Sequence, residues 1–261
     1  MECLWCGKRT GKEPVEHIIP DSLGCPSDLV LADGEVCARC NNKFSRLDQI
    51  LIREFDMMRF MAGVPNKRGE PPTIAMRPNT RGTYTDDGPQ LAINMENHSV
   101  RHATGETVGA YTGDDRSLRM SMQRVGIHGT ATIRQESLCN STEACRALHK
   151  IAFSLFAKQL GMSRARSPRY DPVRGYVRSG RGERIVLLVP ACQGFNYENA
   201  AFQSDGSAFD SEVSAFRIAV VFFFVDLSPE QSWLPTLKGK FRTCLGDKWT
   251  WVPLKAATAS R

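Results

Sequence analysis

Four cysteines near the start of the chain have the spacing of a zinc site. They form two C-x2-C pairs, Cys3–Cys6 and Cys37–Cys40. Each pair supplies two thiolates from one tight turn, and a tetrahedral zinc ion takes four such ligands. Because all four positions are cysteine, no position stays open for a substrate, and the sequence predicts a structural Zn²⁺ rather than a catalytic one. Chance spacing of free thiols is the alternative.

A short segment between the cysteine pairs combines an acid, a histidine and a proline. It is Glu16–Pro20 (EHIIP), followed by Leu23–Gly24, and Asn41 comes directly after the second pair. In combination with the cysteines, these residues resemble HNH endonucleases of the zinc-stabilised type, whose active site is a ββα-metal finger. The resemblance covers roughly residues 1–60.

The resemblance implies a role for each of three residues. His17 matches the general base of the family, and a histidine with a pKa near neutrality suits proton abstraction from water. Glu16 and Asn41 match two ligands of a divalent ion, and hard Mg²⁺ or Mn²⁺ prefers oxygen ligands. The implied cofactors are therefore a structural Zn²⁺ and a catalytic Mg²⁺ or Mn²⁺. The implied activity is hydrolysis of DNA phosphodiester bonds.

Three positions depart from the family pattern. No asparagine is available for the middle position of the motif, where Asp28 is the nearest candidate. Cys25 stands where many members have a second glycine, and Phe44 stands where a lysine is often found. The departures at Asp28 and Cys25 give weight to an alternative in which the cysteines and arginines serve binding and Glu16 and His17 have no catalytic use.

Each candidate residue also has a structural interpretation. His17 taken alone fits a packed histidine, Glu16 a surface acid, and Asn41 a helix N-cap, a position that asparagine favours. Asn42 is an alternative ligand to Asn41. Asp48, two turns further along the expected helix, is an additional candidate.

The net charge of +6 comes mainly from one segment. Residues 163–184 hold seven arginines and two acids, a local charge of 7 − 2 = +5. A concentrated positive charge indicates an anionic partner, most commonly nucleic acid, and a solvated arginine-rich loop is the alternative. Tyr170 and Tyr176 in this segment are predicted to stack on exposed bases. The predicted nucleic-acid-binding residues are Arg39, Lys43, Arg46, Arg164, Arg166, Arg169, Arg174, Arg178 and Arg181.

The elements that must position the N-terminal residues are two strands and a helix. Short strands are expected at Val15–Ile19 and Leu29–Leu31, with a turn at Pro20. A helix is expected over Cys37–Met61, because apolar residues recur at three- and four-residue spacing. The members of this stripe are Phe44, Leu47, Leu51, Phe55, Met58 and Met61.

The remaining elements follow a Pro- and Gly-rich segment, residues 63–72. Residues 73–135 alternate in short β-like pieces. Ser141–Gly161 predicts a helix capped by Ser141 or Thr142, with Gly161 at its end. Two buried strands are expected at ERIVLLVP (183–190) and FRIAVVFFFVDL (216–227), and a last short strand at Trp249 and Trp251.

These elements predict an α+β chain. Residues 1–62 are expected to form a ββα-metal, treble-clef-like HNH finger stabilised by zinc. Residues 63–72 would be a linker, and residues 73–261 a larger mixed α/β domain that recognises the target.

The composition is that of a globular protein, with 41% hydrophobic and 24% charged residues. The longest apolar run is too short to span a bilayer, and the N-terminus has no apolar signal region, so a cytoplasmic protein without membrane contact is expected. The predicted function is a metal-dependent HNH endonuclease of bacterial or phage restriction or defence. The alternative is a non-catalytic zinc module that binds nucleic acid or protein. Whether the substrate is DNA or RNA, and whether a homodimer or partner subunit is needed, stay open.

Overall fold

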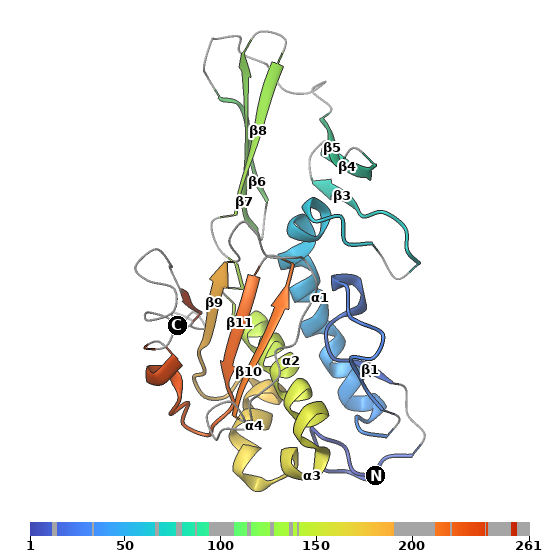
Figure 1. The fold of residues 1–261 in the computed structure, drawn as a ribbon, viewed down its shortest axis with the longest axis vertical. Helices are drawn as coiled ribbons and strands as arrows, with labels where there is room; N and C mark the ends of the chain where they lie inside the picture. Colours follow the sequence, from blue (N-terminus) through green and yellow to red (C-terminus); the bar gives the residue numbers. More distant parts are fainter. Residues whose placement is uncertain are drawn as a thin grey trace.

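The computed structural model describes residues 1–11, 15–32, 34–65, 68–76, 80–86, 88–93, 107–113, 116–125, 128–135, 138–139, 141–190, 212–219, 221–237, 239 and 252–254. Within these ranges the chain is a mixture of helices and small sheets, as the α+β prediction requires at the coarse level (Figure 1). Every strand pair in them is antiparallel.

Two long helices dominate the described part of the chain. They are α1 (Ala38–Met61) and α2 (Thr142–Leu160). The shorter helices are α3 (Met162–Ala165) and α4 (Asp171–Ser179), with 3₁₀ turns η1 (Asp21–Leu23) and η2 (Pro168–Tyr170). None of the helices described has the length and hydropathy needed to cross a membrane.

The strands in the described ranges form four sheets. A two-stranded ladder joins β1 (Glu16–His17) to β2 (Val30–Leu31). Two three-stranded sheets follow, β3 (Thr73–Met76), β4 (Thr80–Thr85) and β5 (Gly88–Ile93), then β6 (Thr107–Gly113), β7 (Arg116–Val125) and β8 (His128–Gln135). The largest sheet has the order β10–β11–β9–β12, with β9 at Val186–Pro190, β10 at Val213–Ile218, β11 at Val221–Asp226 and β12 at Val252–Leu254.

The expectation of one strand across FRIAVVFFFVDL is wrong. The segment folds back on itself as β10 and β11, which pair from Ile218↔Val221 to Val213↔Asp226. Ala219 between them has a φ of +50°, an unusual angle for a residue with a Cβ. The predicted last strand has a described counterpart in β12, while Trp249 and Trp251 lie outside the described residues.

Helix α1 has the predicted bounds to within a residue, but its last turns bury a different face. Met57 and Phe60 are buried, whereas Met58 is half-buried and Met61 is 49% exposed. The reason is a tertiary contact, because the Phe60 ring meets the Tyr84 ring of β4 edge-on at 6.5 Å. The first four members of the predicted stripe, Phe44, Leu47, Leu51 and Phe55, are buried as expected.

Helix α2 is the centre of the molecule. Ser141 caps it by accepting a hydrogen bond from the Ala144 N–H at 3.1 Å, and Gly161 ends it. Every residue from Ala144 to Ala157 except Arg146 is buried. A helix buried nearly all round needs cover on several sides, and α2 lies between α1 on one side and the β9–β11 sheet on the other (Figure 1).

One hydrophobic core joins the N-terminal residues to the rest of the chain. Trp5 lies 5.0 Å from Phe44 of α1 and 5.5 Å from Phe153 of α2, and Phe55 lies 5.8 Å from Phe223 of β11, as ring centroids. Residues 1–62 therefore do not depend on a small core of their own. The boundaries proposed at 1–62, 63–72 and 73–261 stay a prediction.

Candidate metal centre and nuclease site

The four cysteines of the two pairs come together in one cluster. The sulfur atoms of Cys3, Cys6, Cys37 and Cys40 all lie within 4.8 Å of one another, and the Sγ atoms of Cys6 and Cys37 are 3.7 Å apart. A tetrahedral zinc site with Zn–S bonds of about 2.3 Å has sulfur–sulfur edges of about 3.8 Å. The cluster could therefore hold a zinc ion with small adjustments.

Local structure explains how each pair presents its sulfurs. The first pair lies in a tight turn, where Gly7 takes a φ of +68° and its N–H donates to the Cys3 carbonyl at 2.9 Å. The second pair lies at the start of α1, where the Cys37 N–H donates to the Cys3 sulfur at 3.4 Å. The hydrogen bond between the two thiols lowers the pKa of Cys3 and raises the pKa of Cys40. A thiolate at Cys3 is the form that binds zinc.

The segment Glu16–Pro20 forms the first strand of the ladder and the bend that follows it. Glu16 pairs with Leu31 and His17 with Val30 in β1 and β2. Neighbouring strand residues point to opposite sides, so Glu16 is 2% exposed and His17 is half-buried. Pro20 then leads into η1, which confirms the expected turn. The buried Nδ1 of His17 has no hydrogen-bond partner among the described residues.

The Glu16 carboxylate is held by a lysine that is distant in sequence. Lys150 of α2 is completely buried, and its Nζ lies 2.9 Å from Glu16 Oε1 and 2.8 and 3.0 Å from the two carboxylate oxygens of Asp48 in α1. Burial raises the pKa of Glu16, and Lys150 opposes that shift. Burial also lowers the pKa of Lys150, but the two carboxylates outweigh it and raise that pKa overall, so the ammonium form persists.

Asn41 lies in the second turn of α1 and is half-buried. The helix begins at Ala38 with Cys37 as its cap residue, and the Asn41 N–H donates to the Cys37 carbonyl at 3.0 Å. The alternative role of Asn41 as an N-cap is therefore wrong. Asn42 is exposed, and Asp28, the candidate for the middle motif position, is exposed in the connection between β1 and β2.

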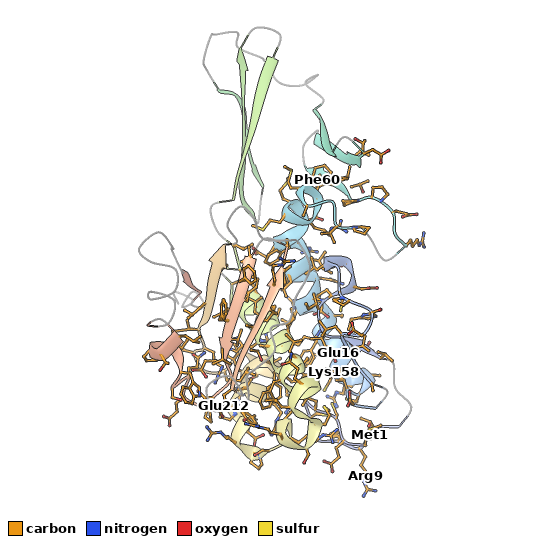
Figure 2. The ribbon with its side chains drawn as sticks, viewed as in Figure 1. Met1, Arg9, Glu16, Phe60, Lys158 and Glu212 are labelled. Atoms are coloured by element: carbon orange, nitrogen blue, oxygen red, sulfur yellow. The ribbon has the colours of Figure 1, made fainter. Side chains whose placement is uncertain are left out.

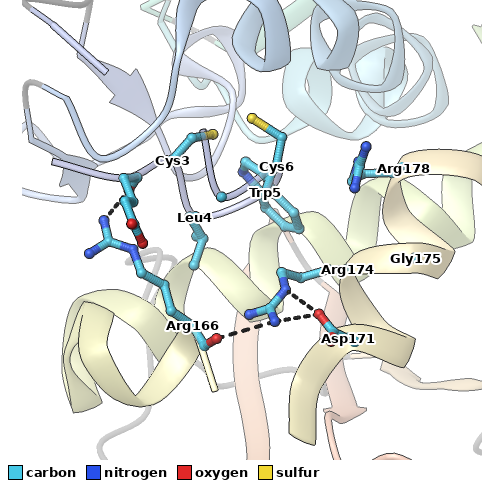
Figure 3. Close-up of a pocket in the computed structure, with 11 residues that line it drawn as sticks. Cys3, Leu4, Trp5, Cys6, Arg166, Asp171, Arg174, Gly175 and Arg178 are labelled. Carbon is cyan, nitrogen blue, oxygen red and sulfur yellow. Dashed lines mark hydrogen bonds and ion pairs between the residues drawn. The ribbon is translucent and has the colours of Figure 1, made fainter. Parts of the chain in front are cut away.

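The arginine-rich segment packs beneath the first cysteine pair rather than forming a loop. A pocket of about 400 Å³ separates the turn at Cys3–Gly7 from α4. Arg166, Arg174 and Arg178 are among the residues that line it (Figure 3). Two buried N–H groups of its lining, Trp5 Nε1 and Arg166 Nε, have no hydrogen-bond partner within the described parts of the chain. The pocket is therefore rich in hydrogen-bond donors.

Several of the predicted nucleic-acid-binding residues have structural partners. Arg174 pairs with Asp171 and donates to the carbonyls of Ser167 and Arg166. Arg169 pairs with Glu212 at 2.8 Å, which lowers the pKa of that carboxyl against the effect of burial.

Other predicted contacts point outward. Those exposed on α1 are Arg39, Lys43 and Arg46, and those exposed beyond α2 are Arg164, Arg178 and Arg181. Lys43 also donates to the Arg178 carbonyl at 2.9 Å, where it caps the end of α4.

The predicted stacking of Tyr170 and Tyr176 on bases is wrong. Both side chains are buried, at 2% and 1% exposure, and Tyr170 packs 4.8 Å from Phe156. Their rings belong to the core beneath α2, because η2 and α4 turn them inward.

Lys150 is the site residue that sequence reasoning missed. One signal was present: Lys150 is the only Lys, Arg, Asp or Glu in the mostly apolar segment 147–157 of α2. A lysine at such a position is buried only when carboxylates meet it, and Glu16 and Asp48 are 134 and 102 residues away. Comparison with known families, with curated proteins and with solved structures finds no match for this chain. The candidate site therefore rests on this geometry and on the resemblance of its residues.

Proposed function

We propose that this chain is a metal-dependent endonuclease of the HNH type that hydrolyses DNA phosphodiester bonds. The observation that carries the proposal is the clustering of four thiols that ties the turn before β1 to the first turn of α1. The order of strand, strand and helix around such a cluster is the one that the motif residues lead us to expect. In the proposal, the Glu16–His17 strand and Asn41 belong to one ββα-metal unit.

His17 supplies the general base in this proposal. Its ring is half-buried on the side of β1 away from Glu16, and its Nδ1 is unpartnered among the described residues. A neutral imidazole can accept a proton from water as a general base. General-base catalysis of this kind contributes about 10²-fold or more.

A divalent ion would stabilise negative charge on the phosphate and on the leaving oxygen. The residues present fit such an ion in part. Glu16 uses Oε1 for Lys150, while its buried Oε2 has no hydrogen-bond partner among the residues that the structure describes. Oε2 of Glu16 and the amide oxygen of Asn41 are therefore the groups that would hold Mg²⁺ or Mn²⁺.

The arginine pocket supplies a place for backbone phosphates. Guanidinium groups bind phosphate through paired N–H donors, and contacts to phosphate do not depend on base sequence. Arg178 is exposed at the pocket, and Arg39 and Arg46 are exposed on helix α1, whose Lys43 donates to the Arg178 carbonyl. These side chains support the binding of a nucleic acid, and a bacterial or phage defence role belongs to the proposal by resemblance alone.

The test is nicking of supercoiled plasmid by purified protein. With Mg²⁺ or Mn²⁺ we expect cleavage that EDTA abolishes and that His17→Ala reduces about 10²-fold or more. Ser27→Ala is the matched control and should cleave like wild type, because Ser27 is exposed in the connection that follows β1. Residual nicking that is equal in wild type and His17→Ala would sink the proposal. Parallel digestion of RNA decides between the two substrates.

A second candidate is a zinc module that binds nucleic acid without cutting it. The burial of Glu16 and its ion pair with Lys150 favour it, because a carboxylate used for structure is less available to a metal. Tight binding of DNA with no cleavage under any divalent ion is the result that would select this function.

A further inference from the structure

A buried lysine connects three elements at the candidate site. Lys150 comes from α2, Glu16 from β1 and Asp48 from α1, and the lysine nitrogen lies within 3.0 Å of an oxygen of each acid. Figure 2 labels Glu16 in the N-terminal part of the chain, beside the long helices. The three side chains therefore fix the strand of the motif against both long helices.

The ion pairs of Lys150 with Glu16 and Asp48 are largely buried, unlike ion pairs at a protein surface. Lys150 and Glu16 are 0% and 2% exposed, whereas the Asp48 side chain is 22% exposed. Exposed ion pairs contribute little, but removing one partner of a buried pair leaves an uncompensated charge. Two carboxylates share one ammonium, so the group retains one negative charge if all three are ionised.

Because Glu16 is next to His17 in the chain, the ion pair between Lys150 and Glu16 also affects the position of His17. The backbone of β1 carries both residues, and this short strand pairs with Val30 and Leu31. A two-residue ladder is weak by itself, so a side-chain anchor on Glu16 limits how far the His17 ring can move. The anchor also leaves Oε2 of Glu16 as the oxygen without a partner.

We propose that Lys150 is a positioning residue of the nuclease site, which orients Glu16 and, through β1, the His17 ring. The role rests on the proposed function. In this proposal Lys150 contacts neither the phosphodiester nor the attacking water, and it acts through Glu16. Residues beyond the direct ligands that orient them typically change activity by 10- to 100-fold when they are removed.

The experiment compares Lys150→Met, Lys150→Arg and Lys158→Met in the full chain. Lys158 lies on the same helix two turns later and is exposed, so it is the matched control. We expect Lys150→Met to keep its zinc, to bind DNA with unchanged affinity and to slow single-turnover cleavage by about 10- to 100-fold. Lys150→Arg should recover part of the rate, because it keeps a cation between the acids.

A second readout does not need activity. The His17 ring resonance in ¹H–¹³C NMR spectra, assigned with His17→Ala, should shift in Lys150→Met and stay in place in Lys158→Met. An unmoved resonance, or cleavage at the wild-type rate, overturns the positioning role. If wild type itself cleaves nothing, the proposed function fails while the resonance still reports on Lys150.

Failure of Lys150→Met to fold would leave one further variant. Asp48→Asn removes the negative charge of the more exposed carboxylate that pairs with Lys150, and it keeps the lysine. We expect a smaller shift of the His17 resonance in this variant. Spectra in which the His17 resonance of Asp48→Asn matches wild type would contradict the proposal.

Discussion

Arg178 has an exposed side chain beside the pocket, and the other two arginines of the pocket already have partners within the protein. Arg174 is paired with Asp171 and Arg166 donates to the Glu2 carbonyl, whereas no contact of the Arg178 guanidinium is found among the described residues. A guanidinium in that position is available to a phosphate oxygen.

Replacing Arg178 by alanine should weaken DNA binding uniformly across sequences. Loss of one phosphate contact reduces the slope of log K against log salt by about one. Fluorescence anisotropy over a salt series measures this slope. Arg53→Ala, an exposed arginine on α1 outside the pocket, is the control. An unchanged slope in Arg178→Ala would remove the pocket from the binding surface.

Single residues show where sequence reasoning succeeds and where it stops. The C-x2-C spacing predicted the thiol cluster, because each pair needs only a local turn. The partners of Arg169 and Lys150 could not be predicted, since Glu212 and Glu16 are brought to them by the fold. For the same reason Glu16, expected to be a surface acid or a metal ligand, was not predicted to be buried in an ion pair.

Helix α2 carries a buried histidine that should make the protein sensitive to acid. His149 is completely buried, with Nδ1 2.8 Å from the Cys145 carbonyl and its ring 5.0 Å from the ring of Tyr176. Burial, reinforced by the positive charge of Arg184, lowers the pKa of His149 from 6.5 to about 3. The folded protein therefore binds fewer protons than the unfolded chain between these two pH values.

The direction in which stability changes with pH follows from that difference in bound protons. Stability is fully present above pH 6.5 and falls as the pH drops toward 3, by about 1.4 kcal/mol per pH unit from this residue. Urea unfolding of wild type and His149→Leu at several pH values measures it. His149→Leu should lose this part of the pH slope, whatever its stability at pH 7. Equal slopes in both proteins would contradict the assignment.

Elements set by local pattern were predicted well, and elements set by tertiary contact were not. Helices α1 and α2 follow from apolar spacing together with Ser141 and Gly161 at the ends of α2. The β10–β11 hairpin escaped prediction because its turn residue, Ala219, is not one of the usual turn formers. Phe60 is buried in place of Met61 because Tyr84 lies beside it.

At the scale of the whole molecule, the thiol cluster is attached to a core that extends through α2 to the large sheet. Trp5, between Cys3 and Cys6, contacts both long helices. Loss of the metal should therefore disturb α2 as well as the N-terminal residues. The shared core was not predictable from the sequence, since residues 1–62 looked like a finger held together mainly by zinc.

Removal of a zinc ion bound at the four cysteines should destabilise the whole chain. We expect chelation to lower Tm by roughly 10 °C or more, since a loss of several kcal/mol shifts a chain of this size by that amount. Hydrogen exchange should increase in α2 as well as in residues 1–62. Increased exchange confined to residues 1–62 would show that the shared core does not transmit the loss.

The most direct test of the nuclease assignment is a crystal of the full chain soaked with Mn²⁺ and measured at the manganese absorption edge. The proposed function predicts anomalous density between Glu16 and Asn41. Strong zinc density at the four cysteines with no manganese at Glu16, and Lys150 still covering that carboxylate, would contradict it.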